Sequence, residues 1–247
     1  MHDLSVAYPQ PGGASLLALG PLSVEIERGT FVCLIGPSGC GKSTLIRVLA
    51  GLQAPSQGQT LLDEEIIQKP SRRVGLMFQD SNLMPWRSVI DNIALPLELQ
   101  GVGVAERHQM ARALLPRLGL STEFANAVPG ELSGGMAQRV ALGRVLIQQP
   151  DVLLLDEPFG ALDSLTREQV ALDLMQMWAT AAPTILMVTH NINEAVLLAD
   201  RILVLSSRPG RLAADISVTL PRPRHLSDVY SDPFGETAQA VRQALRL

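Results

Sequence analysis

The sequence has few cysteines, no long hydrophobic run and no excess of positive charge. Cys33 and Cys40 are the only cysteines among 247 residues, and neither has histidine or cysteine companions at metal-ligand spacing. This argues against a disulfide framework or a zinc site and favours a reducing compartment. No segment approaches the roughly 18 consecutive apolar residues that a membrane-spanning helix requires, and MHDLSVAYPQ lacks the basic-then-apolar pattern of a signal peptide.

The charge balance narrows the classes of function further. The net charge is −4 and hydrophobic residues make up 47% of the chain, which is typical neither of a nucleic-acid-binding polycation nor of a disordered acidic chain. The length suits one large α/β domain or a domain with an inserted subdomain. We therefore expect a folded protein that stays in the cytoplasm unless another subunit holds it at a membrane.

Apolar runs of strand length alternate with segments of helical spacing. Strands are predicted in SVEIER (23–28), TFVCLIG, RRVGLMF, PDVLLLDEP, PTILMVTH and RILVLSS. Helices are predicted in STLIRVLAGL, from Ile90 to about Leu120, in REQVALDLMQMWATAA, in INEAVLLAD and near AQAVRQALRL. This alternation predicts a largely parallel sheet covered on both faces by helices, followed by a tail rich in proline and arginine.

The first glycine-rich loop, GPSGCGKST, fits the phosphate-binding pattern G-x-x-x-x-G-K-[ST] between a predicted strand and a predicted helix. Glycines let backbone N–H groups surround phosphates, and the following helix dipole adds positive potential. Lys42 is expected to reach the β- and γ-phosphates of ATP and Ser43 to bind Mg²⁺. The same N–H groups and dipole predict a reactive thiolate at Cys40. The predicted nucleotide-binding residues are Gly36, Pro37, Ser38, Gly39, Cys40, Gly41, Lys42, Ser43 and Thr44.

The strand VLLLDEP places Asp156 and Glu157 at its carboxyl end, where open α/β sheets bind ligands. Asp156 is expected to hold Mg²⁺, and Glu157 to act as the general base that polarises the attacking water. Two buried acids with only structural roles would each need a partner to offset their desolvation. We therefore favour a catalytic pair over a structural one.

A second glycine-bearing loop, ELSGGMAQRV, opens another predicted helix. A helix cap would account for Ser133, but not for Gly134 and Gly135 together. The alternative is that the loop binds a phosphate held elsewhere, since N–H groups at a helix N-terminus bind anions.

Six motifs in order resemble the nucleotide-binding subunit of ATP-binding-cassette (ABC) transporters: GPSGCGKST, Gln79, LSGGMAQ, LLLDEP, ALD at 161–163 and His190 after a strand. The resemblance covers about residues 4–210. It implies a P-loop NTPase (RecA-like) core with a small antiparallel β subdomain and an inserted helical subdomain. The expected division is a nucleotide-binding core at 1–80 and 149–205, a helical subdomain at 81–148 and a tail at 206–247.

The resemblance also implies roles for individual residues. Tyr8 would stack on adenine, Gln79 would contact Mg²⁺ and water, and His190 would hydrogen-bond the γ-phosphate. Asp163 would belong to the nucleotide site. In the family, the LSGG loop binds the γ-phosphate of ATP held by a second cassette, so Ser133, Gly134 and Gly135 would act in trans in a homodimer that sandwiches two nucleotides.

A narrower resemblance is to importer ATPases for nitrate, taurine and alkanesulfonates. It rests on FQDSNLMPWRSVIDNIALPLEL, LSGGMAQRVALGRVL and VTHNINEAVLLADRILVLSSRPGRL. Trp86 is interpreted either as part of a groove for the permease or as a buried tryptophan. Asn191, Ala137 and Asp63-Glu64-Glu65 depart from the group's usual residues, and none of these changes removes a catalytic group. The family's first strand begins earlier, so Met1 is expected to be a late start or the edge of the sequence.

The resulting hypothesis is an ATP-hydrolysing importer subunit, at the cytoplasmic face of the inner membrane, that energises uptake of a small solute such as nitrate, sulfonate or taurine. Its expected partners are membrane permease subunits, a periplasmic or lipid-anchored solute-binding protein and a second copy of itself, with no nucleic acid. The alternatives are a soluble ABC ATPase that is not coupled to transport and the ATPase of an exporter. The acidic balance disfavours binding to a phosphate backbone.

Overall fold

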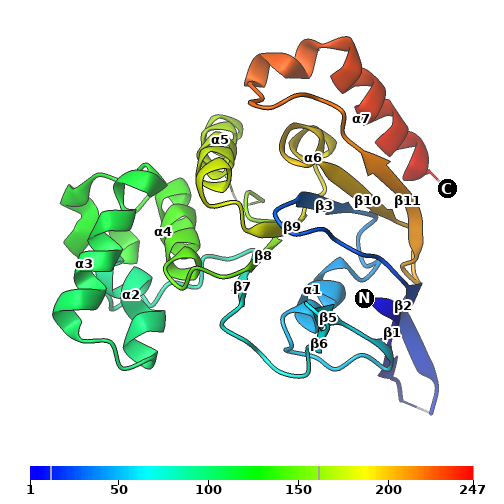
Figure 1. The fold of residues 1–247 in the computed structure, drawn as a ribbon, viewed down its shortest axis with the longest axis horizontal. Coiled ribbons are helices and arrows are strands. Elements are labelled where there is room, and N and C mark those ends of the chain that lie inside the picture. Colours follow the sequence, from blue (N-terminus) through cyan, green and yellow to red (C-terminus); the bar gives the residue numbers. More distant parts are fainter. Residues whose placement is uncertain (12, 161, 247) are drawn as a thin grey trace. The chain divides into compact units, whose positions relative to one another are not determined.

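The structure is a computed structural model that describes residues 1–11, 13–160 and 162–246 (Figure 1). It comprises two compact units: unit 1 is formed by 1–74 and 184–247, and unit 2 by 75–183. Within the described residues, no helix is long and apolar enough to cross a membrane.

Unit 1 is built on a mainly parallel sheet with strand order β11-β10-β3-β9. The parallel strands are β3 (Phe31–Ile35), β9 (Thr184–Val188) and β10 (Arg201–Leu205). All five β3 side chains are at most 1% exposed, as expected for a strand covered on both faces. β11 (Leu212–Ser217) pairs with β10 in the antiparallel direction. The sequence predicted β3, β9 and β10 but missed β11.

A smaller antiparallel sheet in the same unit has the order β2-β1-β4. Its strands are β1 (His2–Pro9), β2 (Ser15–Leu22) and β4 (Gln57–Gln59). The predicted strand at 23–28 was wrong, because this segment follows β2 as irregular chain. Its Val24 exchanges backbone hydrogen bonds with Met1, at 3.0 and 3.1 Å, and within the described part of the chain these bonds extend into no longer ladder.

Two further strands of unit 1, β5 (Leu61–Leu62) and β6 (Glu65–Ile66), form a hairpin. Asp63 and Glu64 make the turn with φ values of 51° and 71°, the left-handed conformation that an Asp-Gly pair would adopt more readily. The Asp63 carboxylate is paired with Arg28 and Arg73, and these bonds lower its pKa. The turn missing its usual glycine is thus held by ion pairs.

The helices of unit 1 are α1 (Lys42–Leu49), α6 (Ile192–Leu198) and α7 (Asp232–Ala244), with a 3₁₀ turn η4 (Leu226–Tyr230) before α7. α6 packs on β3, and α7 packs on α6 and β11. The buried guanidinium of Arg224 donates to the carbonyls of Val196, Leu197 and Ala199 at 2.6–3.2 Å. These carbonyls lie at the C-terminal end of α6, where the helix itself provides no hydrogen-bond donors. Burial lowers the pKa of Arg224 to about 10.

Unit 2 contains two neighbouring strands and a set of helices. The strands are β7 (Val74–Met77), at the unit boundary, and β8 (Val152–Asp156). The helices are α2 (Val89–Leu99), α3 (Val104–Leu114), α4 (Gly134–Leu146) and α5 (Ser164–Ala181), with 3₁₀ turns η1 (Pro116–Leu118), η2 (Thr122–Asn126) and η3 (Pro129–Glu131). α2 packs against α3 and α4. The predicted helical stretch between Ile90 and Leu120 corresponds to α2, α3 and η1.

Candidate nucleotide site

The phosphate loop lies between the end of β3 at Ile35 and the start of α1 at Lys42. The Lys42 ammonium, on a side chain only 8% exposed, donates to the carbonyls of Gly36 at 2.8 Å and Pro37 at 3.0 Å. The loop turns at Gly39 and Gly41, whose φ values of 74° and 103° disfavour any residue with a side chain. A strand, a glycine turn and a lysine hydrogen-bonded to the loop backbone therefore meet at a helix N-terminus. This is the arrangement that binds phosphates.

The predicted reactivity of Cys40 was wrong. Its side chain is fully buried, and burial raises the pKa of the thiol, against the smaller lowering effects of Lys42 and backbone N–H groups. The sulfur lies 2.8 Å from the position that a Cβ on Gly36 would take. The desolvation of a thiolate here exceeds the stabilisation that the helix N-terminus offers, so Cys40 packs beneath the loop as a thiol.

Tyr8 lies beside the phosphate loop. Its hydroxyl is 3.1 Å from Oγ1 of Thr44 and donates to Oε1 of Gln53 at 3.0 Å. β1 carries Tyr8 to this place, and Thr44 belongs to the first turn of α1. The sequence placed Tyr8 near the nucleotide only by resemblance, and neither hydrogen bond was predictable from the spacing.

His190 occupies the short connection between β9 and α6, and its side chain is exposed. The connection is fixed on either side of it. The hydroxyl of Thr189 donates to Glu194 at 2.6 Å and accepts from the N–H of Asn191 at 3.0 Å. Asn191 also caps α6 by accepting the N–H groups of Asn193 and Glu194. An asparagine here therefore serves the capping role that the family's usual aspartate could also fill.

In unit 2, β8 ends at Asp156, and Glu157 turns out of the strand with φ 47°. A left-handed conformation costs a residue with a side chain about 1–2 kcal/mol, and such strain is concentrated at functional sites. A Cβ on Gly160 would lie 3.6 Å from both Oε2 of Glu157 and Nε2 of Gln79. The predicted base and the predicted Gln79 therefore share one small region.

The second glycine loop and the start of α5 lie together. Ser133 caps α4 by accepting the N–H of Met136 at 3.3 Å, and Asp163 caps α5 by accepting the N–H of Thr166 at 3.0 Å. Hydrogen bonds from the side chain and the N–H of Thr166 lower the pKa of Asp163. A Cβ on Gly135 would overlap Cγ2 of Thr166, whereas one on Gly134 would meet, among the described residues, Leu162 alone, at 3.8 Å. Of the ALD motif, Ala161 is outside the described residues.

The cap accounts for Ser133 and the packing accounts for Gly135, but neither accounts for Gly134. The structure thus gives a local reason for two of the three residues that were predicted to bind phosphate in trans. Their predicted role stays a prediction.

Side chains of α4 hold the backbone after Gln79, a feature that the sequence did not indicate. Gln138 donates to the carbonyl of Gln79 at 2.9 Å, and Arg144 donates to those of Ser81 and Asn82 at 2.7 Å each. Burial lowers the pKa of Arg144. The helix that begins at the second glycine loop is thus bonded along its length to the segment that carries Gln79. A polar pair six positions apart on a helix gives no signal for such contacts.

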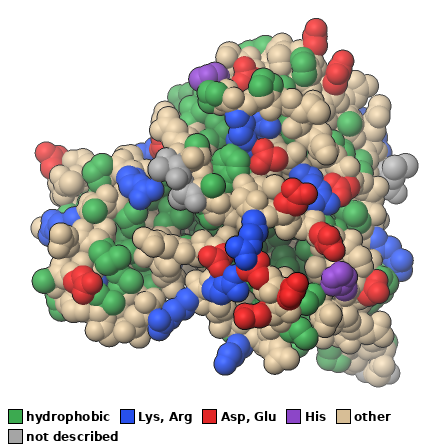
Figure 2. All heavy atoms as spheres, in the orientation of Figure 1, with side chains coloured by type: hydrophobic (Ala, Val, Ile, Leu, Met, Phe, Trp, Pro, Cys, Tyr) green, Lys and Arg blue, Asp and Glu red, His purple; other side chains and the backbone are tan. Residues whose placement is uncertain are grey.

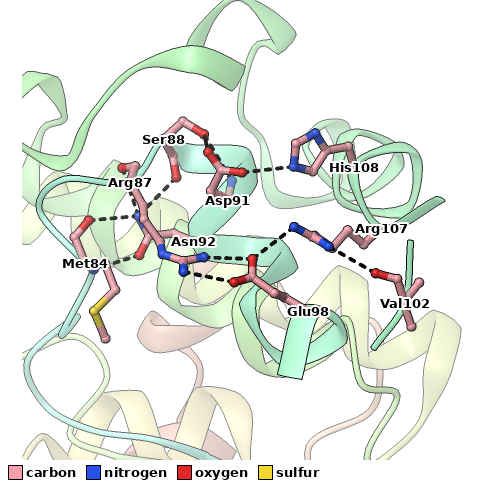
Figure 3. Close-up of polar contacts among 9 residues, drawn as sticks. All are labelled: Met84, Arg87, Ser88, Asp91, Asn92, Glu98, Val102, Arg107 and His108. Atoms are coloured by element: carbon pink, nitrogen blue, oxygen red, sulfur yellow. Dashed lines mark hydrogen bonds and ion pairs between the residues drawn. The ribbon is translucent and has the colours of Figure 1, made fainter. Parts of the chain in front are cut away.

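The segment before α2 displays Trp86, whose side chain is 75% exposed, so the interpretation as a buried tryptophan was wrong. Figure 3 shows how Asn92 holds this segment. Its fully buried amide bonds to both the N–H and the carbonyl of Met84 and to the carbonyls of Arg87 and Ser88, at 2.8–3.2 Å.

Ion pairs in Figure 3 fasten the same segment to α2 and α3. Both guanidinium nitrogens of Arg87 donate to Glu98, at 2.9 and 3.0 Å, and Arg107 donates to the same carboxylate at 3.1 Å. The Arg87 bonds lower the pKa of Glu98. Trp86 is therefore exposed on a segment fixed on both sides, and not on a loose loop.

Comparison with known proteins decides the family. The family described as ABC transporter matches residues 19–160, more than half of the chain. The chain belongs to the ABC transporter family. Its fold is that of the family's P-loop ATPase cassette, with a parallel-sheet core. The family hydrolyses ATP, which agrees with the interpretation of GPSGCGKST as a phosphate-binding loop.

Individual relatives of this ABC cassette cover most of its length. An uncharacterised ABC transporter ATP-binding protein of Methanocaldococcus jannaschii is 42% identical over 88% of this chain and 81% of its own. A taurine import ATP-binding protein of Rhizobium johnstonii is 46% identical over 88% and 83%. A nitrate import ATP-binding protein of Synechococcus elongatus is 40% identical over 92% and 83%.

A solved structure is similar throughout the fold. A dimeric ATP-binding cassette in a post-hydrolysis state, bound to ADP and Pi, superposes with a TM-score of 0.78 at 31% identity, covering 89% of this chain and 98% of its own.

Proposed function

We propose that this chain is the ATP-binding and ATP-hydrolysing subunit of an importer that takes up a small anionic solute such as nitrate, a sulfonate or taurine. The observation that carries the proposal is the 46% identity to a taurine import ATP-binding protein over 88% of the chain. The partners follow from importer relatives: membrane permease subunits, a solute-binding protein and a second copy of this chain. The site of action is then the cytoplasmic face of the membrane.

The proposed roles at the nucleotide follow from the chemistry of each residue. Lys42 exchanges the carbonyls of Gly36 and Pro37 for phosphate oxygens, which carry more charge and are better acceptors. The N–H groups of the loop surround the phosphates, and the ring of Tyr8 stacks on adenine. Because the Cys40 side chain is buried, it contributes its backbone alone.

Mg²⁺ is the proposed metal. The expected ligands are Ser43, Gln79 and Asp156, whose hydroxyl, amide and carboxylate oxygens are the donors that this ion prefers. Among the described residues, no group of three or more His, Cys, Asp or Glu side chains is arranged to hold a metal. When bound, Mg²⁺ neutralises charge that develops on the phosphates.

For hydrolysis, Glu157 accepts a proton from the attacking water, while Gln79 orients that water and His190 donates to the γ-phosphate. Ser133, Gly134 and Gly135 are proposed to bind the γ-phosphate of ATP on the second copy. Asp163, which caps α5 beside this loop, is proposed to fix the loop's position.

Nucleic acid is not among the proposed partners. On the face shown in Figure 2, basic side chains are interspersed with acidic ones instead of forming a single-sign patch. Binding of a phosphate backbone depends on clustered lysine and arginine.

The test is to purify the chain with its co-encoded permease and binding protein in lipid vesicles and to measure ATP hydrolysis with taurine, nitrate or an alkanesulfonate present. We expect one of these anions to stimulate hydrolysis several-fold. Hydrolysis that responds to none of them, in a complex that couples hydrolysis to transport of another solute, would refute the solute class. A chain that hydrolyses ATP but assembles with no membrane protein would refute the importer assignment.

A further inference from the structure

The connection between β10 and β11, residues 206–211 with the sequence SSRPGR, has no role in the site described above. It is closed on itself: the N–H of Ser206 donates to the carbonyl of Arg211 at 2.9 Å, and the N–H of Arg211 donates to Oγ of Ser206 at 3.1 Å. The Ser206 hydroxyl also reaches the carbonyl of Pro209 at 3.3 Å. These bonds make the connection a defined structural element of unit 1.

The side chain of Arg208 binds the phosphate loop directly. Its Nε and Nη2 both donate to the carbonyl oxygen of Gly39, at 3.1 and 3.0 Å, across 169 positions of sequence. Arg208 and Gly39 are both exposed. A hydrogen bond from a charged donor is stronger than one between neutral groups, and here one carbonyl accepts two of them.

The backbone of the connection is fixed against the same loop. Gly210 donates to the carbonyl of Ala18 at 3.0 Å and accepts from the N–H of Gly20 at 2.9 Å, which joins it to β2. A Cβ on Gly210 would overlap the carbonyl oxygen of Cys40. This close approach requires glycine, and it brings Arg208 to a fixed distance from the phosphate loop.

The direction of the Gly39 carbonyl matters for an anion. Gly39 has φ 74° and no side chain, so its flanking peptides can rotate more easily than those of other residues. The N–H of the Gly39–Cys40 peptide donates to the carbonyl of Pro37 at 3.3 Å, a long bond that phosphate oxygens, as better acceptors, can replace. A peptide that rotated would turn its carbonyl oxygen toward the phosphates. Two bonds from Arg208 oppose this rotation, because the carbonyl would have to leave both donors. Lys42 holds the carbonyls of Gly36 and Pro37 in a similar way.

We propose that Arg208 is a positioning residue for the phosphate loop: it holds the Gly39 carbonyl on the arginine side and so keeps that oxygen from turning toward the nucleotide's phosphates. This proposal rests on the proposed function, since it concerns the ATP site. It assigns to the SSRPGR connection the task of ordering the loop before the nucleotide binds, which lowers the cost of binding.

The experiment compares Arg208→Met with Arg211→Met by calorimetric titration of Mg-ATP and Mg-ADP into the full chain, with thermal melting of the nucleotide-free proteins. Arg211 lies in the same connection, and its side chain packs over Gly20. Arg208→Met should weaken both nucleotides about tenfold, or about 1.4 kcal/mol, with an unchanged melting temperature. Arg211→Met should bind like the wild type. A merely structural role would lower the melting temperature and leave the affinity unchanged.

Three results would overturn the proposal. Wild-type affinity in folded Arg208→Met would show that the contact does not position the loop. Equal losses in Arg208→Met and Arg211→Met would show an effect of net charge. A wild-type chain that binds no ATP would refute the proposed function and this inference together, and is distinguished from the other two by the wild-type titration. Should Arg208→Met fail to fold, Arg208→Lys decides: with one donor group it should lose about threefold in affinity, and wild-type affinity would overturn the proposal.

Discussion

The hydroxyl of Tyr8 lies 3.1 Å from Oγ1 of Thr44, across 36 positions of sequence. It joins the first strand of the small antiparallel sheet to the first turn of the helix that follows the phosphate loop. The aromatic ring proposed to stack on adenine is thereby held at a fixed place beside the loop proposed to hold the phosphates. Two parts of one side chain thus have separate tasks. The hydroxyl holds Tyr8 in place, and the ring is the part proposed to stack on adenine.

Substitutions of Tyr8 can separate these tasks. Tyr8→Phe loses the bonds to Thr44 and Gln53, which should reduce the free energy of unfolding by about 0.5–1.5 kcal/mol while ATP affinity changes less than about threefold. Tyr8→Ala also loses the ring and should weaken ATP about tenfold or more. Urea denaturation and nucleotide titration measure the two effects. Equal losses of affinity in both variants would show that the hydroxyl, not the ring, is what the nucleotide site needs.

Glu157→Gln should bind ATP normally and lose turnover by about a hundredfold or more, because the amide keeps the shape of the carboxylate but accepts no proton from water. ATP should then hold two copies together, as an ATP-dependent dimer on size exclusion. Asp151→Asn, a change of the same kind in the same unit outside the proposed site, is the control. Near wild-type hydrolysis by Glu157→Gln would refute its role as the base.

The proposed role of the second glycine loop in trans is tested by mixing two inactive variants. Lys42→Ala disables a chain's own phosphate loop. Ser133→Arg disables the second glycine loop, which is proposed to bind the γ-phosphate of the ATP held by the partner chain. In a mixed dimer both lesions meet at one nucleotide, and the other nucleotide faces an intact Lys42 and an intact Ser133. Single-turnover hydrolysis should therefore recover at one site. Differentially tagged mixed dimers that close on ATP, as shown by a nucleotide-dependent crosslink, yet recover nothing would contradict the role in trans.

The packing of Gly135 predicts a rescue that is independent of any functional role. Gly135→Ala places a Cβ against Cγ2 of Thr166 and should reduce the free energy of unfolding by about 1–3 kcal/mol. Thr166→Ser removes that methyl group and should restore most of the loss in the double variant. Gly134→Ala is the matched control, because its Cβ would lie 3.8 Å from Leu162, an ordinary contact distance, so it should be neutral or slightly stabilising. A double variant no more stable than Gly135→Ala would show that Thr166 does not set the requirement for glycine.

The buried thiol of Cys40 should react slowly with maleimide. Because burial raises its pKa, the thiolate fraction at pH 7 is below that of a free thiol and increases only as pH rises toward the raised value. Labelling followed by mass spectrometry should be at least tenfold slower than that of a free thiol at pH 7 and should accelerate in urea. Cys40→Ser controls for labelling of Cys33, whose pKa burial also raises. Rapid labelling of the folded chain at pH 7 would show that Cys40 is an exposed thiolate.

Elements with a local signal could be predicted from the amino-acid sequence. The runs that became β3, β9 and β10 are continuously apolar, and GPSGCGKST lies between a strand and a helix because glycine torsions and a helix N-terminus are both encoded within nine residues. Six motifs in order then identified the family. The strand at 23–28 failed because an apolar alternation does not show whether a partner strand is available to pair with it.

The contacts that each of these segments makes became visible only in the folded chain. The sequence does not show which side chains are buried. Cys40 is buried, which raises the pKa of its thiol, whereas Trp86 is exposed. Contacts between distant positions brought Tyr8 to Thr44 and Arg208 to Gly39, since a hydrogen bond depends on distance in space and carries no periodic pattern along the chain. The sequence thus fixes the chemistry available to the nucleotide, and the packing of the chain decides which groups are held in place to perform it.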